Sequence, residues 1–186
     1  MKEEVEKAAQ VISEGGVILY PTDTIWGLGC DPGNDKAIEK IVAIKKRDES
    51  KHFIVLVNSE FLLNKYVELI PELCYDLMDM AERPITIVYP KGIHVSKKIL
   101  AEDGSIAIRK TNHPFCDAVM QKTKCGLIST SANISGQPFP ATFADIDPQI
   151  LNQVDYVVNL NRDQQAGIPS QIIKIGLKGE LKIIRK

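Results

Sequence analysis

The sequence lacks the features that mark an exported, membrane-spanning or disulfide-stabilised protein. Its N-terminus, MKEE, is charged, so it does not resemble a signal peptide, and no apolar run is long enough to span a bilayer. The four cysteines form no C-x-x-C pair, and we expect free thiols in a cytoplasmic protein. A large excess of charge of one sign is also missing. The formal net charge is -1, which argues against a protein that mainly wraps nucleic acid.

Familiar ligand-binding signatures are missing too. The chain has no G-x-x-x-x-G-K-[ST] sequence, so we do not expect a nucleotide to be held by a P-loop. A G-x-G sequence at 27–29 begins like a dinucleotide fingerprint, but Pro32 stands at the position of the third glycine. The histidines have no metal-ligand spacing, and no Cys–His pairing is indicated. We therefore expect no metal ion held by protein side chains, and cysteines that fill the core.

Length and hydrophobic patterning predict one α/β domain over residues 1–186. A chain of 186 residues can bury about 70% of its unfolded surface, so it needs no disulfide or metal to fold. Helical and strand patterns alternate early and strands dominate late, which favours a twisted, mixed β-sheet flanked by helices. Strands are expected at 17–20, 53–57, 85–89, 105–109, 127–129, 156–158, 172–175 and 181–184. The polar stretch 161–169 is a candidate lid.

Two polar segments, far apart in the sequence, each follow an apolar run that predicts a buried strand. The first is YPTDTIWGLG at 20–29, and the second is STSANISG at 129–136. Side chains just past strand ends are held rigidly and stay accessible, so such places often bind ligands. Each hydroxyl could equally cap a turn. The combination of both segments with nearby cations favours a site for an anionic substrate.

Cations lie close to these segments in the predicted fold. Lys45 and Arg47 come at the end of a predicted helix and Lys51 just before a strand, where they could bracket a polyphosphate or simply face solvent. Arg109 and Arg185 end predicted strands in apolar surroundings. Each of these two arginines therefore needs a carboxylate partner, from the protein or from a ligand.

At these residues the chain resembles the YrdC/YciO family, in particular its threonylcarbamoyl-AMP synthases. The resemblance runs from Gly16 to Arg185 and implies an α/β sheet with a concave ligand-binding face. The family's signatures Y-P-T-[DE]-T-x-[YW]-G-L-G, K-x-R, K-P-L-x-V-x-[VI], V-R-x-P-x-H-P and S-x-N are similar to the sequences at 20–29, 45–47, 51–57, 108–114 and 131–133.

The resemblance implies a nucleotidyltransferase that joins L-threonine, bicarbonate and ATP into threonylcarbamoyl-adenylate and pyrophosphate. Its product would serve downstream transferase proteins that modify an adenosine of tRNA. Mg²⁺ would accompany the ATP phosphates without a protein cage. By resemblance, the catalytic residues are Lys45, Arg47 and Lys51, the nucleotide-binding residues are Arg47, Lys51, Ser105, Ser129, Ser131, Asn133 and Arg185, and the threonine-binding residues are Thr24, Arg109 and Ser170.

Two positions depart from the family pattern. Leu56 stands where many members carry a histidine that approaches threonine, and Phe139 stands where many carry a serine near the nucleotide. Two other functions stay open: a YciO-like protein that binds double-stranded RNA or tRNA without synthase activity, and a regulatory protein that binds ATP without releasing pyrophosphate. RNA affinity through phosphates would fall steeply with salt. The basic face for RNA would consist of Lys45, Lys46, Arg47, Lys51, Arg109 and Lys110.

Overall fold

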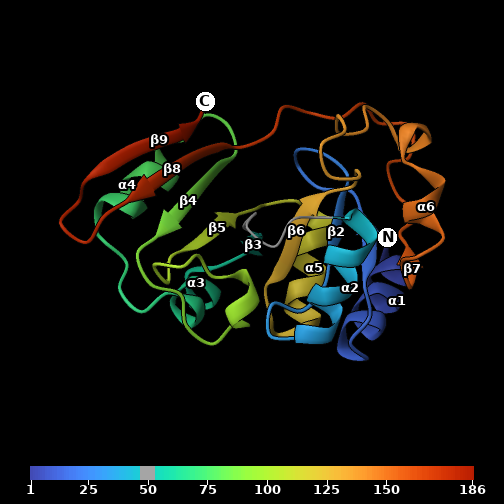
Figure 1. Ribbon diagram of the computed structural model, residues 1–186, viewed down its shortest axis with the longest axis horizontal. Helices are drawn as coiled ribbons and strands as arrows, with labels where there is room; N and C mark the ends of the chain where they lie inside the picture. Colours follow the sequence, from blue (N-terminus) through green and yellow to red (C-terminus); the bar gives the residue numbers. More distant parts are fainter. Residues whose placement is uncertain (47–52) are drawn as a thin grey trace.

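The computed structural model describes residues 1–46 and 53–186, which form a nine-stranded mixed sheet with helices packed around it (Figure 1). The strand order is β7-β1-β2-β6-β3-β5-β4-β8-β9. The predicted α/β class with a mixed sheet is confirmed. The strands are β1 (Ile18–Tyr20), β2 (Gly27–Gly29), β3 (Ile54–Val57), β4 (Ile85–Tyr89), β5 (Ile106–Lys110), β6 (Leu127–Ser131), β7 (Tyr156–Val157), β8 (Gln171–Ile175) and β9 (Leu181–Arg185).

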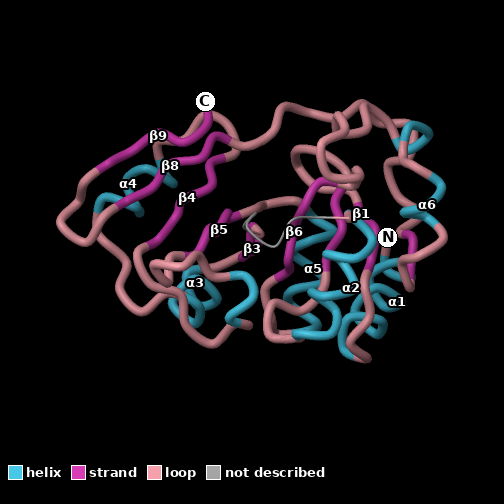
Figure 2. Tube along the Cα trace, in the orientation of Figure 1, coloured by secondary structure: helices cyan, strands magenta, loops and turns pink. Residues whose placement is uncertain are grey.

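The helices gather in two groups. In Figure 1, α1, α2 and α5 lie beside β1, β2 and β6, whereas α3 and α4 accompany the other half of the sheet. The long connection from β7 to β8 runs mostly as loop along one rim of the molecule (Figure 2). The helices are α1 (Lys2–Ser13), α2 (Asp35–Lys45), α3 (Glu60–Tyr66), α4 (Leu73–Asp79), α5 (Pro114–Thr123) and α6 (Pro148–Leu151), with short 3₁₀ turns at Lys97–Ile99 and Phe143–Asp145.

Helix α2 matters most for the site because its last residue reaches the ligand-binding face. The side chain of Asn34 accepts a hydrogen bond from the main-chain N–H of Ala37 at 3.1 Å and so caps the helix start. Lys46 adopts a left-handed conformation, with φ of 47°, and ends the helix. Ile38 and Ile41 are buried on the apolar face, and Lys45 is buried with them.

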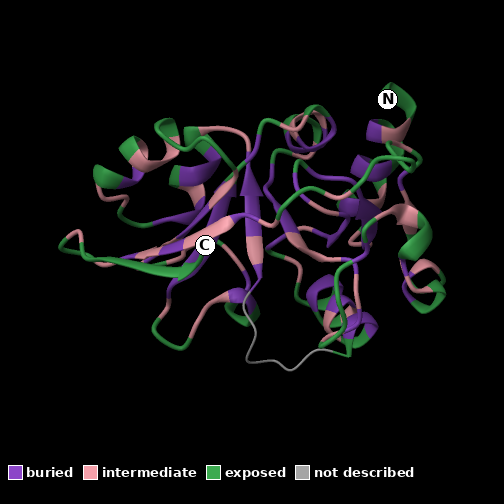
Figure 3. Cartoon of the chain, turned by 90° about the horizontal axis from the view of Figure 1, so that it is seen from above, coloured by how far each residue is buried: buried purple, intermediate pink, exposed green. Residues whose placement is uncertain are grey.

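The strand register places one row of side chains across the middle of the sheet. Ser129 pairs with Ile54, Ile54 with Ala107, and Ala107 with Val88. Directly paired residues project from the same face of a sheet, because side chains alternate along each strand. These four residues therefore share one face, and that face carries the cavity described below. Buried residues run along the sheet, and exposed ones lie mainly on helices and loops (Figure 3).

Strand β2 was not predicted from the sequence. Its glycines look like turn punctuation, yet Gly27 pairs with Tyr20 and Ser131, and Gly29 pairs with Ile18. A Cβ atom on Gly29 would lie 2.4 Å from the carbonyl oxygen of Ile128, so the strands approach too closely for a side chain. The predicted strand at 127–129 likewise extends to Ser131, so the first hydroxyls of the second polar segment lie within β6.

The cysteines behave as predicted for core residues. All four are buried and none forms a disulfide. Within the described ranges, no helix is both long enough and apolar enough to cross a bilayer.

Candidate functional site

A cavity of about 570 Å³ opens over the central row of the sheet. Its floor is apolar and includes Ile54, Val88, Ala107 and Ile172. Among the described residues, the lining contains no carboxylate. Such a lining suits a ligand with an apolar body and negatively charged groups. The polar and charged side chains around it include Thr24, Lys45, Arg109, Ser129, Ser131, Asn133, Ser170 and Arg185.

The structure brings together nearly all of the candidate residues that it describes. Thr24, Lys45, Ser129, Ser131, Asn133, Arg109, Ser170 and Arg185 all line the cavity. Ser105 does not: it precedes β5, is buried, and hydrogen-bonds to Asp103. Arg47 and Lys51 lie outside the described residues, so their proposed roles remain predictions.

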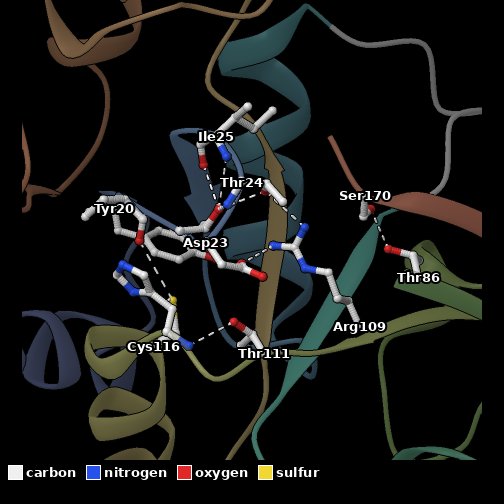
Figure 4. Close-up of polar contacts among 12 residues, drawn as sticks. Tyr20, Asp23, Thr24, Ile25, Thr86, Arg109, Thr111, Cys116 and Ser170 are labelled. Atoms are coloured by element: carbon white, nitrogen blue, oxygen red, sulfur yellow. Dashed lines mark hydrogen bonds and ion pairs between the residues drawn. The ribbon is translucent and has the colours of Figure 1, made fainter. Parts of the chain in front are cut away.

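Arg109, near the carboxyl end of β5, is the most constrained cation of the site (Figure 4). Its side chain is only 4% exposed; Nη1 donates to Thr24 Oγ1 at 3.0 Å, and Nη2 forms an ion pair with Asp23 Oδ1 at 3.0 Å. Asp23 is thus the protein carboxylate that the sequence required. Nε of Arg109 is a buried donor with no acceptor in the described part of the chain. An unpaired buried donor costs about 1–3 kcal/mol.

Hydroxyl groups in the loop between β1 and β2 form a relay that ends at Arg109. Thr22 Oγ1 donates to the carbonyl oxygen of Ile25 at 2.8 Å, and Thr24 Oγ1 lies 3.0 Å from Thr22 Oγ1. Thr22 Oγ1 also accepts from the main-chain N–H groups of Thr24, at 3.0 Å, and of Ile25, at 3.2 Å, so its hydroxyl holds the turn of this loop together. Thr24 Oγ1 accepts from Arg109 Nη1, which links this loop to β5.

The side chain of Lys45 hydrogen-bonds to the segment 131–133, which carries the S-x-N signature, and holds it in place. Its residue is 3% exposed, and Nζ donates to the carbonyl oxygens of Ser131 and Asn133, the latter at 2.7 Å, and to Asn133 Oδ1 at 3.3 Å. The Asn133 amide nitrogen donates in turn to Gln137 O at 2.6 Å. Both side chains are therefore engaged in holding the loop against β6. A catalytic role for Lys45 remains a prediction beside this structural one.

Arg185 and Ser170 form the opposite wall of the cavity. Arg185 donates through Nε and Nη2 to the carbonyl oxygen of Ser170, at 3.0 and 2.7 Å. Burial lowers the pKa of Arg185 below its ordinary value, and the positive charge of Arg109 lowers it further. The positive charges of these two guanidinium groups repel each other, and an anion bound in the cavity between them would relieve that repulsion.

A cysteine and a histidine lie together beside this site, contrary to the expectation from the sequence. Cys116 Sγ is 3.6 Å from His113 Nδ1, because the two residues lie one turn apart at the start of α5. Burial raises the pKa of the Cys116 thiol far above its usual range, and burial also lowers the pKa of His113. Both groups are therefore held neutral, and the thiol is not an activated nucleophile.

The candidate lid at 161–169 is hydrogen-bonded to the loop between β1 and β2 that contains Thr24. The N–H of Gly167 donates to the carbonyl oxygen of Thr24 at 2.6 Å, and that of Ala166 donates to Ala141 O at 2.7 Å. A Cβ atom on Gly167 would lie 3.0 Å from Thr24 O. This segment ends at Pro169, and Pro169 and the following Ser170 line the cavity. Lid motion remains a prediction.

The basic face considered for RNA is not assembled as expected. Lys45 and Arg109 are buried, and their donors are directed to protein acceptors. Lys46 is exposed and contacts Gln149, whereas Lys110 is exposed at the end of β5. Two of the cations expected on the surface are therefore buried in the fold, where they line the cavity and do not form part of an exposed face for an RNA duplex.

Comparison with known proteins assigns the family. A Sua5/YciO/YrdC family model, described as telomere recombination, matches residues 10–186. A curated protein named threonylcarbamoyl-AMP synthase, from Pseudoalteromonas translucida, is 36% identical over 158 residues, covering 83% of this chain and 84% of its own length. The chain therefore belongs to the Sua5/YciO/YrdC family.

Solved structures share the fold. P. abyssi Sua5 superposes with a TM-score of 0.83 at 25% identity over 91% of this chain; this chain spans about half, 52%, of that structure's length. The same protein solved with L-threonine gives a TM-score of 0.79 at 23% identity, over 92% of this chain and 50% of the other. E. coli YciO gives 0.85 at 22% identity, over 100% and 90% of the two chains. At such identities the likeness to the last two shows the fold alone.

Proposed function

We propose that this protein is a threonylcarbamoyl-AMP synthase, an enzyme that condenses L-threonine, bicarbonate and ATP and releases pyrophosphate. One observation carries the proposal: Arg109 and Arg185 converge on a cavity whose described lining has no carboxylate. The substrates bring a carboxylate, a carbamate and a triphosphate. The relatives named as synthases, similar over most of the chain, support this function over the YciO-like alternative.

The chemistry follows from these groups. The amine of threonine bonds to the carbon of CO₂ drawn from bicarbonate and loses a proton, which gives N-carboxythreonine. A carbamate oxygen then attacks the α-phosphorus of ATP, and the bond to the bridging oxygen of pyrophosphate breaks. Two anions must approach each other in this step. Arg109 and Arg185 lower that repulsion, and the cavity supplies positioning rather than a covalent nucleophile.

The described lining also bears on the metal. Hydroxyl and amide oxygens face the cavity, but carboxylates, which bind Mg²⁺ strongly in proteins, do not. Among the described residues no cluster of acidic, histidine or cysteine side chains could hold a metal ion. Mg²⁺ would therefore enter bound to the ATP phosphates, with Ser129 and Ser131 within the cavity as oxygen donors.

Three parts of the proposal reach beyond the cavity itself. Residues 1–186 would work as one catalytic domain in the cytoplasm. The unstable adenylate would pass to a downstream transferase that modifies tRNA. Arg47 and Lys51 would bind the nucleotide phosphates and complete the catalytic set, as the family signatures imply.

The test measures pyrophosphate release by the purified chain with ATP and Mg²⁺, with L-threonine and bicarbonate added separately and together. We expect release only when both are present. Arg109→Lys keeps the positive charge but replaces the planar guanidinium, with its several N–H donors, by a single ammonium group, so kcat/KM for threonine should fall about tenfold or more. Lys110→Ala is the matched control, since Lys110 is the next residue of β5 and does not line this cavity. Threonine-independent release, or RNA affinity without turnover, would refute the proposal.

A further inference from the structure

Behind Ser170 lies a second hydroxyl that the sequence did not single out. Thr86 Oγ1, on β4, is 2.7 Å from Ser170 Oγ, and both groups are buried. Thr86 is fully buried, at 0% exposure, and does not line the cavity, whereas Ser170 does. Strand pairing fixes their relation, because Thr86 is opposite Ile172 in the β4–β8 register and Gln171 N donates to Pro84 O at 3.0 Å.

Counting protons decides which hydroxyl donates. The pair has two hydroxyl protons and one hydrogen bond between them. In the described part of the chain, Thr86 Oγ1 has no other hydrogen-bond partner than Ser170. If Ser170 donated, the Thr86 proton would be buried without an acceptor, at a cost of about 1–3 kcal/mol. Thr86 therefore donates, and the proton of Ser170 is left over.

The other contacts of Ser170 agree with this assignment. Arg185 Nη2 lies 3.3 Å from Ser170 Oγ and can only donate to it. Donation from Thr86 and from Arg185 uses both lone pairs of the Ser170 oxygen. What Ser170 presents to the cavity is then its O–H, which has to find an acceptor.

We propose that Thr86 is a positioning residue that directs the hydroxyl proton of Ser170 into the cavity, toward an anionic oxygen of L-threonine. The inference rests on the proposed function, because it takes threonine as the ligand beside Ser170. Thr86 acts through Ser170 and touches no substrate itself. Its hydroxyl sets the direction in which Ser170 donates, and thereby favours an acceptor over a donor at that point of the ligand.

The test removes the Thr86 hydroxyl and keeps its shape. In Thr86→Val, the KM for L-threonine should rise about five- to tenfold, the effect of one ordinary hydrogen bond to a charged acceptor, while kcat changes less than twofold. Thr86→Ser should restore KM to within about twofold, since it restores the hydroxyl. Thr86→Val should still fold, because valine suits a buried strand, although Tm should drop somewhat since Ser170 Oγ loses a buried partner. Thr123→Val removes a hydroxyl on α5 that donates to Val119 O and accepts from Cys125 Sγ, away from the cavity, and should leave KM unchanged.

A double-mutant cycle separates positioning from a general structural role. Adding Thr86→Val to Ser170→Ala should raise KM no further, because the proton that Thr86 directs is already gone. An equal rise in both backgrounds, or an unchanged KM in Thr86→Val, would overturn the inference while leaving the synthase function intact. Absence of threonine-dependent turnover in the unmodified protein would refute both. Thr86→Ala serves the same cycle if Thr86→Val does not fold.

Discussion

Replacing Lys45 by methionine separates the construction of the site from its chemistry. Methionine keeps the length and apolar stem of lysine but has no donor. The substitution removes the hydrogen bonds from Nζ to the carbonyl oxygens of Ser131 and Asn133 and the longer contact to Asn133 Oδ1. These acceptors lie at the end of β6 and on the loop that follows it, so the side-chain part of the attachment to α2 is lost, whereas the main-chain bond from Ser135 N to Lys45 O remains.

The magnitude follows from the number and burial of these bonds. A hydrogen bond from a charged donor contributes about 1.5 kcal/mol or more, and Lys45 makes two short ones to main-chain oxygens at a position that is 3% exposed. We therefore expect Lys45→Met to lower the free energy of unfolding by about 3 kcal/mol. For a chain of 186 residues, that corresponds to a fall in Tm of roughly 6–12 °C.

The assay is urea unfolding followed by tryptophan fluorescence, supported by calorimetry. Lys40→Met is the matched control on the same helix, because Lys40 pairs with Asp155 at 2.6 Å with both side chains more than one-third exposed. Exposed pairs contribute little, so this variant should lose less than about 1 kcal/mol. A Lys45→Met protein as stable as the Lys40→Met control would refute the assignment of Lys45 to the loop.

Three further predictions concern the rim, the lid and the pH dependence. Phe139→Ala should raise the KM for ATP about fivefold or more in steady-state assays and leave that for threonine unchanged, because the exposed Phe139 ring lines the cavity and can stack on a base. Gly167→Ala should raise the KM for threonine several-fold, since its Cβ would lie 3.0 Å from Thr24 O and displace the Thr24 loop. An unchanged KM would show that residues 161–169 do not influence threonine binding. Burial lowers the pKa of His113 below its ordinary value of 6.5 in the folded protein. As the pH is lowered through about 6.5, the unfolded chain therefore binds a proton before the folded one does, and the free energy of unfolding should decrease. In thermal melts, His113→Gln should flatten that decline, and an unaltered pH profile would contradict it.

Local patterns were sufficient to predict most of the fold. Apolar runs predicted most of the buried strands, because that signal is local. Strand β2 escaped prediction because Gly29 is required by a close approach to Ile128, a contact that only the assembled sheet creates. Glycine in a single sequence looks the same whether it serves a turn or a close contact.

The site was predicted less completely, for a related reason. The sequence indicated that Arg109 needs a carboxylate, but only strand pairing brings Asp23 to it. Lys45, at a helix end, could face solvent or the core, and nothing local distinguishes the two. Thr86 is a single hydroxyl in an apolar strand, with no neighbouring signal, and its importance arises from a contact 84 positions away along the chain.

The central claim is that one active site joins threonine, bicarbonate and the AMP part of ATP. The most direct measurement is mass spectrometry of the nucleotide product formed from ¹³C-bicarbonate and ¹⁵N-threonine with ATP. The account predicts a single adenylate that carries both labels and appears together with pyrophosphate. An AMP product with neither label, or with threonine joined directly to AMP without the bicarbonate carbon, would contradict it.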